Sequence, residues 1–147
     1  MPKSEYLKRL SDVEKFFQKE RKSLIVGEYN HAEWLQYVNE FKDEPEGGKR
    51  CALCFKMRME KTAKLASEMG FHSFTTTLTI GPNKPARVIF PIGRQLAKDY
   101  NIKFLEFDFK KKDGFKISCQ LSKQFNMYRQ NYCGCEFSFR DKTIRSR

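Results

Sequence analysis

Two closely spaced pairs of cysteines constrain this chain more than any other feature. Cys51 and Cys54 form a C-x-x-C motif, and Cys133 and Cys135 form a C-x-C motif. Each pair offers two soft thiolates from one short segment, so a shared metal or metal cluster requires a fold that brings the two segments together. Four thiolates suit structural zinc or an iron–sulfur cluster. The spacing favours such a site, and buried small hydrophobic residues or a redox disulfide are the alternatives.

The size and composition of the chain place it in a broad class. Its 147 residues suit one domain, residues 1–147, with a substantial core. No apolar run approaches a membrane span, and the charged N-terminus lacks a signal-peptide segment, so we expect a soluble cytoplasmic protein without a membrane partner. Thiols stay reduced there, so five cysteines favour metal or redox chemistry over a disulfide framework. The fifth, Cys119, falls in an expected helix and is interpreted as a free thiol.

The chain is strongly basic, with 29 lysines and arginines, 18 acidic residues and a net charge of +11. A basic surface attracts polyanions such as nucleic acid, although lysine runs are often only solvated surface. Part of the charge lies in Lys110–Lys112 and in the C-terminal residues Arg140, Lys142, Arg145 and Arg147. Charge alone therefore leaves nucleic-acid binding and plain solvation both open.

Hydrophobic periodicity predicts helices that alternate with short strands. Helices are expected over residues 4–19, from Asn30 as a cap, from near Cys51 to a stop at Gly70, and over residues 86–100 and 115–125. Strands, rich in β-branched and aromatic residues, are expected over residues 24–29, 74–80 and 102–109. This alternation indicates an α/β fold with a mostly parallel sheet and helices on both faces.

Polar residues in the expected strands are candidates for a site, because ligands of open parallel sheets bind at the carboxyl ends of the strands. Thr75–Thr77 lie in one expected strand, and Asp108 lies near the end of another. Both are placed to border the thiols, and strand filler or a solvated carboxylate are the alternatives. His31 and His72 are interpreted as helix or loop residues, because neither has a potential partner nearby in the sequence.

Three segments of the chain together resemble one known family. They are EPEGGKRCALCFKMR at residues 44–58, FTTTLTIGPNK at residues 74–84 and YRQNYCGC at residues 128–135. In this order they resemble the QueH-type epoxyqueuosine reductases, iron–sulfur proteins of the queuosine tRNA-modification pathway. The resemblance covers essentially the whole chain and implies an α/β fold of the adenine-nucleotide α-hydrolase-like class, used without ATP hydrolysis.

The resemblance also implies a reaction and a set of cofactors. The reaction is the reduction of epoxyqueuosine to queuosine at the wobble position of tRNA with a GUN anticodon, and its electrons come from an external donor. The cofactors are a [4Fe-4S] cluster and an additional iron ion. The implied ligands of the cluster are Cys51, Cys54, Cys133 and Cys135.

Four further residues acquire roles from the same resemblance. Asp108 matches an acidic residue after a strand that would lie near the metals. Tyr128, Arg129 and Gln130 match the segment before the C-x-C motif and would line the substrate pocket. For these three, packing of a helix-to-loop segment is the alternative.

The start of the chain departs from the family pattern. The family opens with a strand, a Cys-Cys-x-Pro-Cys motif, a helix and a second strand, whereas Met1–Tyr6 resemble the sequence that follows that second strand. We therefore expect an N-terminally truncated fold with an incomplete sheet and an incomplete metal site. A misassigned start, a separate polypeptide that supplies the opening unit and a decayed copy are the three explanations.

Two other classes of function are compatible with the sequence. A non-catalytic RNA-binding module with zinc or a cluster, or an inactive fragment of the reductase, would use the same cysteines and charge. A thiol oxidoreductase would use Cys51 and Cys54 and would leave Cys133 and Cys135 without a role.

Overall fold

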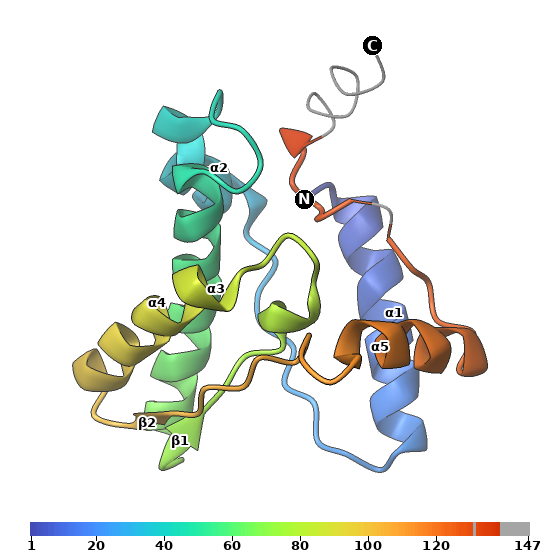
Figure 1. Cartoon of the computed structure of the whole chain (residues 1–147). Coiled ribbons are helices and arrows are strands. Elements are labelled where there is room, and N and C mark those ends of the chain that lie inside the picture. The colour runs from blue at the N-terminus through green and yellow to red at the C-terminus, as the bar shows by residue number, and fades with distance from the viewer. Residues whose placement is uncertain (131, 139–147) are drawn as a thin grey trace. The chain divides into compact units, whose positions relative to one another are not determined.

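A computed structural model describes residues 1–130 and 132–138, and these form two compact units (Figure 1). The α/β unit comprises Glu46–Ser118, and the helical unit comprises Met1–Pro45 and the chain from Cys119 onward. The single domain expected over residues 1–147 stays a prediction. In the described part of the chain, none of the helices combines the length and the apolar character that a membrane crossing requires. The basic C-terminal residues Arg140, Lys142, Arg145 and Arg147 lie outside the described residues.

The α/β unit is built around a short parallel strand pair. Its elements are α3 (Lys49–Glu68), β1 (Ser73–Phe74), the 3-10 helix η2 (Leu78–Ile80), α4 (Ala86–Asp99), β2 (Lys103–Phe104) and the start of α5 (Gly114–Gln124). The strands β1 and β2 pair in parallel, with Ser73 opposite Lys103 and Phe74 opposite Phe104. Parallel strands need a crossover connection, which α4 supplies between them. The predicted α/β class and the parallel pairing are confirmed for this unit, whereas helices on both faces of the sheet stay a prediction.

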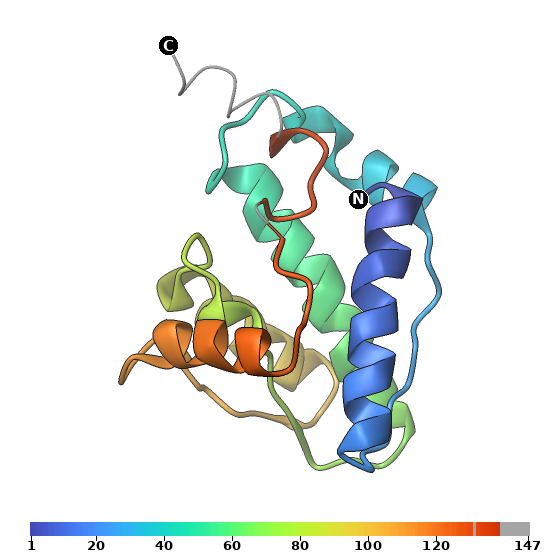
Figure 2. The same ribbon diagram turned by 90° about the vertical axis from the view of Figure 1, so that its right-hand side faces the viewer.

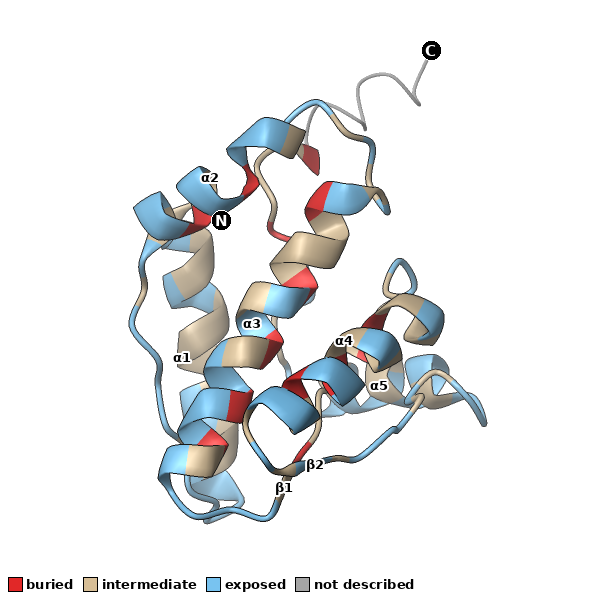
Figure 3. Ribbon diagram, turned by 90° about the vertical axis from the view of Figure 1, so that its left-hand side faces the viewer, coloured by how far each residue is buried: buried red, intermediate tan, exposed pale blue. Residues whose placement is uncertain are grey.

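The core of this unit lies where α3 and α4 pack together and onto the strands. The buried apolar residues of α3 recur every three or four positions, which places them on one face of the helix (Figure 3). Together with one strand residue and two from α4, the core comprises Phe55, Met59, Ala63, Ala66, Phe74, Ile89 and Leu96. Burial of each large side chain stabilises the fold by about 1.5–3 kcal/mol.

The end of α3 follows the sequence prediction. Gly70 has a φ of +75°, a left-handed conformation that glycine adopts without steric cost. Its N–H donates to the carbonyl of Ser67 at 3.0 Å, and the N–H of Phe71 donates to that of Ala66 at 2.9 Å. These two bonds are the Schellman pattern, which satisfies the last carbonyls of the helix. Gly70 therefore ends α3 as expected.

Both strands of the sheet are shorter than the sequence predicts. Of residues 74–80 and 102–109, only Phe74 and Lys103–Phe104 lie in strands, and Leu78–Ile80 form η2. Beyond the strand pair, threonine hydroxyls bond backbone groups in place of strand-to-strand hydrogen bonds. Thr75 Oγ1 donates to the Leu105 carbonyl at 2.8 Å, and Thr76 Oγ1 accepts the Leu78 N–H at 3.2 Å. Such side-chain bonds compete with strand pairing and explain the difference.

The helical unit contains α1 (Lys3–Lys19), α2 (His31–Val38), the 3-10 helix η1 (Asn39–Phe41) and the remainder of α5. The predicted cap of α2 is confirmed, because Asn30 Oδ1 accepts the Glu33 N–H at 3.0 Å. A contact between α1 and the residue after α5 joins the two stretches of the chain that make up this unit. There, the rings of Phe16 and Phe125 meet edge to face at a centroid distance of 5.3 Å.

The strand predicted over residues 24–29 is wrong. This segment is extended and runs back beside α1 (Figure 2), but it pairs with no strand among the described residues. Ile25 and Val26 are 57% and 46% exposed, and one of the contacts nearby is a hydrogen bond from the Tyr6 hydroxyl to the Gly27 carbonyl at 3.4 Å. β-branched residues favour a strand only where a neighbouring strand accepts their backbone hydrogen bonds.

Close packing of α4 on β2 gives a test of the fold. A Cβ added at Gly93 would lie 2.3 Å from Phe104 Cε1, so Gly93→Ala forces the ring to move. Overpacking costs about 1–3 kcal/mol, against about 1 kcal/mol gained in helix propensity. We expect a lower urea midpoint for Gly93→Ala. Gly27→Ala is the matched control, because nothing lies within 4 Å of its added Cβ. Equal midpoints for the two variants would contradict the packing.

Candidate functional site

The first thiol pair lies in the opening turns of α3. Cys51 and Cys54 are three residues apart on this helix, so they share one face, and both are half-buried. The backbone N–H of Gly47 donates to Cys51 Sγ at 3.2 Å. A helix N-terminus carries a partial positive charge, which complements the negative charge of a metal-bound sulfur. The local fold therefore presents this pair in a form suited to a metal ligand.

A tight turn packs against this thiol segment. The turn runs from Gly81 to Lys84 and closes with a hydrogen bond from the Lys84 N–H to the Gly81 carbonyl at 3.2 Å. Asn83 Nδ2 donates to Glu46 Oε1 at 3.1 Å, and Lys84 Nζ lies 5.8 Å from the ring centroid of Phe55. Glu46 and Phe55 flank the first thiol pair in the sequence. Two of the three segments that carry the resemblance thus lie together in the α/β unit.

The segment of Asp108 is attached to the same turn. Lys110 Nζ donates to the carbonyls of Gly81 and Lys84 at 3.3 and 2.8 Å, and the Lys110 N–H donates to Asp108 Oδ1 at 3.3 Å. The turn therefore contacts both the segment of the first thiol pair and the segment of Asp108. The sequence places Lys110 in a basic run typical of a solvated surface, but its ammonium group binds these two backbone carbonyls.

The second thiol pair lies in a compact loop of the helical unit. The Cys135 N–H donates to Cys133 Sγ at 3.4 Å, and the Cys133 thiol contacts Ser138 Oγ at 3.6 Å. Ser138, which is buried, donates through its hydroxyl to the Cys135 carbonyl at 2.6 Å. Gly134 has a φ of +94°, which other residues adopt only with strain. As in the first pair, one sulfur already accepts a backbone N–H.

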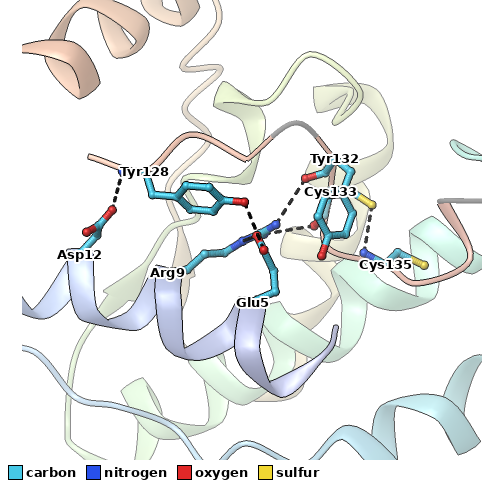
Figure 4. A network of polar contacts seen from close by, with 7 residues as sticks. All are labelled: Glu5, Arg9, Asp12, Tyr128, Tyr132, Cys133 and Cys135. Carbon is cyan, nitrogen blue, oxygen red and sulfur yellow. Dashed lines mark hydrogen bonds and ion pairs between the residues drawn. The ribbon is translucent and has the colours of Figure 1, made fainter. Parts of the chain in front are cut away.

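Residues of α1 hold this loop in place (Figure 4). Arg9 donates from Nη1 to the Cys133 carbonyl and from Nη2 to the Tyr132 carbonyl, both at 3.4 Å. Its Nε pairs with Glu5 Oε1 at 2.7 Å, and the two side chains are only 18% and 12% exposed. The Tyr128 hydroxyl donates to Glu5 Oε2 at 3.2 Å. Two charges on one face of α1, one of them bonded to the Tyr128 phenol, thus anchor the C-x-C segment.

Tyr128, Arg129 and Gln130 have different environments. The backbone N–H of Tyr128 donates to Asp12, and Lys8 Nζ lies 3.9 Å from its ring centroid. Burial, and then the hydrogen bond to Glu5, raises the pKa of Tyr128 above its ordinary value of 10.0, so the hydroxyl stays protonated at neutral pH. Arg129 is exposed and donates to Ser122 Oγ at 3.1 Å, and Gln130 is exposed. Their place in a substrate pocket stays a prediction.

The anchoring residues Glu5, Arg9 and Asp12 were not among the sequence candidates. Apolar spacing alone predicts the N-terminal helix and gives its charged residues no role. Glu5 and Arg9 are separated by one helical turn, which is a recognisable sign of an ion pair. Their contacts with Tyr128, Tyr132 and Cys133 involve residues more than a hundred positions away, and nothing local in the sequence indicates those contacts.

His31 behaves as the sequence indicated, as the first residue of α2. Its Nε2 lies 3.1 Å from Glu136 Oε2, and its ring stacks on Trp34, which in turn stacks on Phe137. These contacts hold the residues just after the second thiol pair. Over residues 1–130 and 132–138, no three His, Cys, Asp or Glu side chains gather as a metal-ligand group.

The chemistry of the donors nonetheless fits a thiolate-bound metal group. Each unit offers two thiols on one short segment, and in each pair one sulfur accepts a backbone N–H. Soft sulfur donors with such hydrogen bonds are typical of zinc and iron–sulfur sites. That Cys51, Cys54, Cys133 and Cys135 together hold such a group stays a prediction.

Anchoring of the second pair by Arg9 predicts a change in thiol reactivity. Arg9→Met removes two hydrogen bonds from a charged donor and leaves Glu5 without its ion-pair partner, a loss of about 1.5–3 kcal/mol per bond. Local opening, and with it iodoacetamide labelling of Cys133 and Cys135 in the reduced, metal-free chain, should rise about 10-fold or more. Labelling is followed by peptide mass spectrometry.

Two controls accompany this experiment. Lys15→Met also replaces a cationic side chain with methionine, at an exposed position of α1, and should leave every rate unchanged. Cys51 and Cys54, which belong to the α/β unit, serve as internal references. Unchanged labelling of Cys133 and Cys135 in Arg9→Met would show that Arg9 does not hold the loop.

Comparison with known proteins identifies the family. The model of a family described as epoxyqueuosine reductase QueH matches residues 1–141. The chain is similar to proteins named epoxyqueuosine reductase QueH from three bacteria. It is 36% identical to that of Streptococcus pyogenes over 143 residues, which cover 93% of this chain and 56% of the relative. For Staphylococcus epidermidis the identity is 39% over 145 residues, covering 93% and 61%. For Thermotoga maritima it is 38% over 144 residues, covering 96% and 75%.

The first two of these relatives are matched over less than two thirds of their own length. The match runs through both units and through all three segments on which the resemblance was based. The resemblance inferred from these three segments is thereby confirmed, and the chain belongs to the epoxyqueuosine reductase QueH family.

Proposed function

We propose that this chain carries out the reduction of epoxyqueuosine to queuosine in tRNA. The observation that carries the proposal is the pair of thiol motifs, each with one sulfur that accepts a backbone N–H, in a chain of this family. The relatives are named for the reduction of epoxyqueuosine, and the net charge of +11 supports a polyanionic substrate. The reaction then takes place in the cytoplasm, with tRNA that carries a GUN anticodon.

The reaction has a defined balance. Both carbon–oxygen bonds of the epoxide break, a carbon–carbon double bond forms, and the oxygen leaves as water. This consumes two electrons and two protons, which an external electron donor and the solvent supply. An iron–sulfur cluster, when bound, passes electrons one at a time, and an adjacent iron ion supplies Lewis acidity toward the epoxide oxygen. A [4Fe-4S] cluster with an additional iron ion is the cofactor set that we propose.

The candidate site residues have different proposed roles. Cys51, Cys54, Cys133 and Cys135 would hold the cluster, and Asp108 would lie beside the metals. The short links from Asp108 to the turn at Gly81–Lys84, and from that turn to Glu46 beside the first thiol pair, support this placement. Tyr128, Arg129 and Gln130 would line the substrate pocket, with Tyr128 oriented by its bond to Glu5.

The anticodon loop and the fold complete the proposal. An unpaired anticodon loop presents its bases outward, so the wobble base is accessible without opening a duplex. Basic residues elsewhere on the chain would bind tRNA phosphates. The β1–α4–β2 unit, with parallel strands joined through a helix, supports an adenine-nucleotide α-hydrolase-like fold.

Replacing the thiol pairs tests the metal site. The variants Cys51→Ser/Cys54→Ser and Cys133→Ser/Cys135→Ser each remove two soft ligands. We expect both to lose iron and cluster absorbance after anaerobic reconstitution, and to convert no epoxyqueuosine in tRNA with a low-potential reductant. Nucleoside mass spectrometry measures the conversion. Cys119→Ser is the matched control, because this half-buried thiol lies in α5, outside both motifs.

The outcomes separate the competing functions. Full iron loading in either double variant would exclude a shared site. Stoichiometric zinc in place of iron in the anaerobically purified chain, without turnover, would favour the non-catalytic RNA-binding module. Turnover that survives loss of Cys133 and Cys135 but not of Cys51 and Cys54 would favour a thiol oxidoreductase.

The charge of the chain predicts strongly salt-dependent binding of tRNA. Release of counterions makes the logarithm of the binding constant fall linearly with the logarithm of salt concentration, with a slope of about −0.7 to −0.9 per phosphate contact. We expect a slope of the logarithm of the binding constant against the logarithm of salt concentration that is steeper than about −3. Fluorescence anisotropy between about 50 and 200 mM KCl measures it, because the effect is large in this range. A slope near zero would remove the electrostatic argument for tRNA.

A further inference from the structure

A buried threonine holds the chain on both sides of Asp108. Thr79, in η2, is fully buried, and its Oγ1 donates to the carbonyl of Phe107 at 2.8 Å. The same oxygen accepts the N–H of Phe109 at 3.1 Å. The residue enclosed between these two bonds is Asp108. One hydroxyl therefore fixes the peptide groups that precede and follow this carboxylate.

These bonds differ from ordinary strand pairing. The β1–β2 ladder ends with the Leu105 N–H bonded to the Phe74 carbonyl at 2.9 Å. Beyond that point Thr79 replaces the missing backbone partner with a side chain. A hydroxyl can donate once and accept twice, so it can serve a carbonyl and an amide together. Serine can do the same, whereas valine, which has nearly the same shape, can do neither.

Lys110 provides a second fixed point just beyond Asp108. Its ammonium group binds the carbonyls of Gly81 and Lys84, and its backbone N–H binds Asp108 Oδ1 at 3.3 Å. The Lys111 N–H also donates to the Asp108 carbonyl at 3.1 Å. The short segment that carries the carboxylate is thus held at its start by Thr79 and at its end by Lys110.

We propose that Thr79 is a positioning residue that sets the place of the Asp108 carboxylate in the reductase site. This inference rests on the proposed function, because the role of Asp108 is part of it. Misplacement of a catalytic group by about 1 Å can reduce a rate about 100-fold. Loss of the Thr79 hydroxyl should therefore act on turnover through Asp108, while tRNA binding, which depends on the charged surface, stays unchanged.

The experiment compares Thr79→Val, Thr79→Ser and Asp108→Asn, alone and with Thr79→Val combined with Asp108→Asn. We expect Thr79→Val to lower kcat about 10-fold or more with an unchanged KM for tRNA, and Thr79→Ser to restore kcat. The combined variant should be no slower than Asp108→Asn alone, because both changes remove the same contribution. Thr62→Val is the matched control, since that exposed hydroxyl bonds the carbonyl one turn back, at 3.2 Å.

Hydrogen exchange supplies a readout that does not depend on activity. The Phe109 amide donates to Thr79 Oγ1, so its exchange in the chain should be about 10-fold faster in Thr79→Val and unchanged in Thr79→Ser. Absence of turnover in the unmodified chain would refute the proposed function, and the exchange rates would still decide whether Thr79 holds this segment.

Three results would overturn the inference. The first is an unchanged kcat in Thr79→Val despite faster exchange at Phe109. The second is additive losses in the combined variant, which would mean that Thr79 acts independently of Asp108. The third is a Thr79→Val chain that is unfolded by circular dichroism, which would mean that the hydroxyl supports the whole unit and does not position one carboxylate.

Discussion

The packing of α3 against α4 is the interaction on which the α/β unit depends. Met59 from α3, and Ile89 and Leu96 from α4, are almost completely buried. This contact sets the direction of α3, whose first two turns carry the first thiol pair, and it holds the turn that precedes α4. The same apolar surface supports both strands. The candidate ligands of this unit lie at a helix start and next to turns. Their positions therefore depend on a buried core that contains no candidate ligand itself.

Polar contacts extend this order beyond the core. The two-stranded sheet is too short to carry its own ladder to Asp108, and threonine hydroxyls and one lysine ammonium group continue the connection. In the helical unit, Arg9, which is paired with Glu5, holds the segment of the second thiol pair. Both devices use a few charge-assisted or buried hydrogen bonds, which are costly to leave unmade. The loops that carry the proposed ligands are therefore ordered by contacts from outside the loops.

The sequence predicted the helices well and the strands poorly. Apolar spacing, the cap at Asn30 and the stop at Gly70 are local signals, and the structure has helices where these signals place them. The predicted strand over residues 24–29 has no strand partner among the described residues, and those beginning at Phe74 and Ile102 are cut short. Helical hydrogen bonds close within a few residues, whereas a strand exists only if a distant segment lies beside it.

The same distinction holds for the site. The sequence by itself determined the family, the presence of soft sulfur donors and the proximity of the two cysteines within each motif. These are properties of residue type and close spacing. Only the tertiary structure decided that Arg9 anchors the carbonyl of Cys133 and that Thr79 encloses Asp108. Those contacts join residues far apart in the chain, and packing alone selects them from the many polar side chains that the sequence contains.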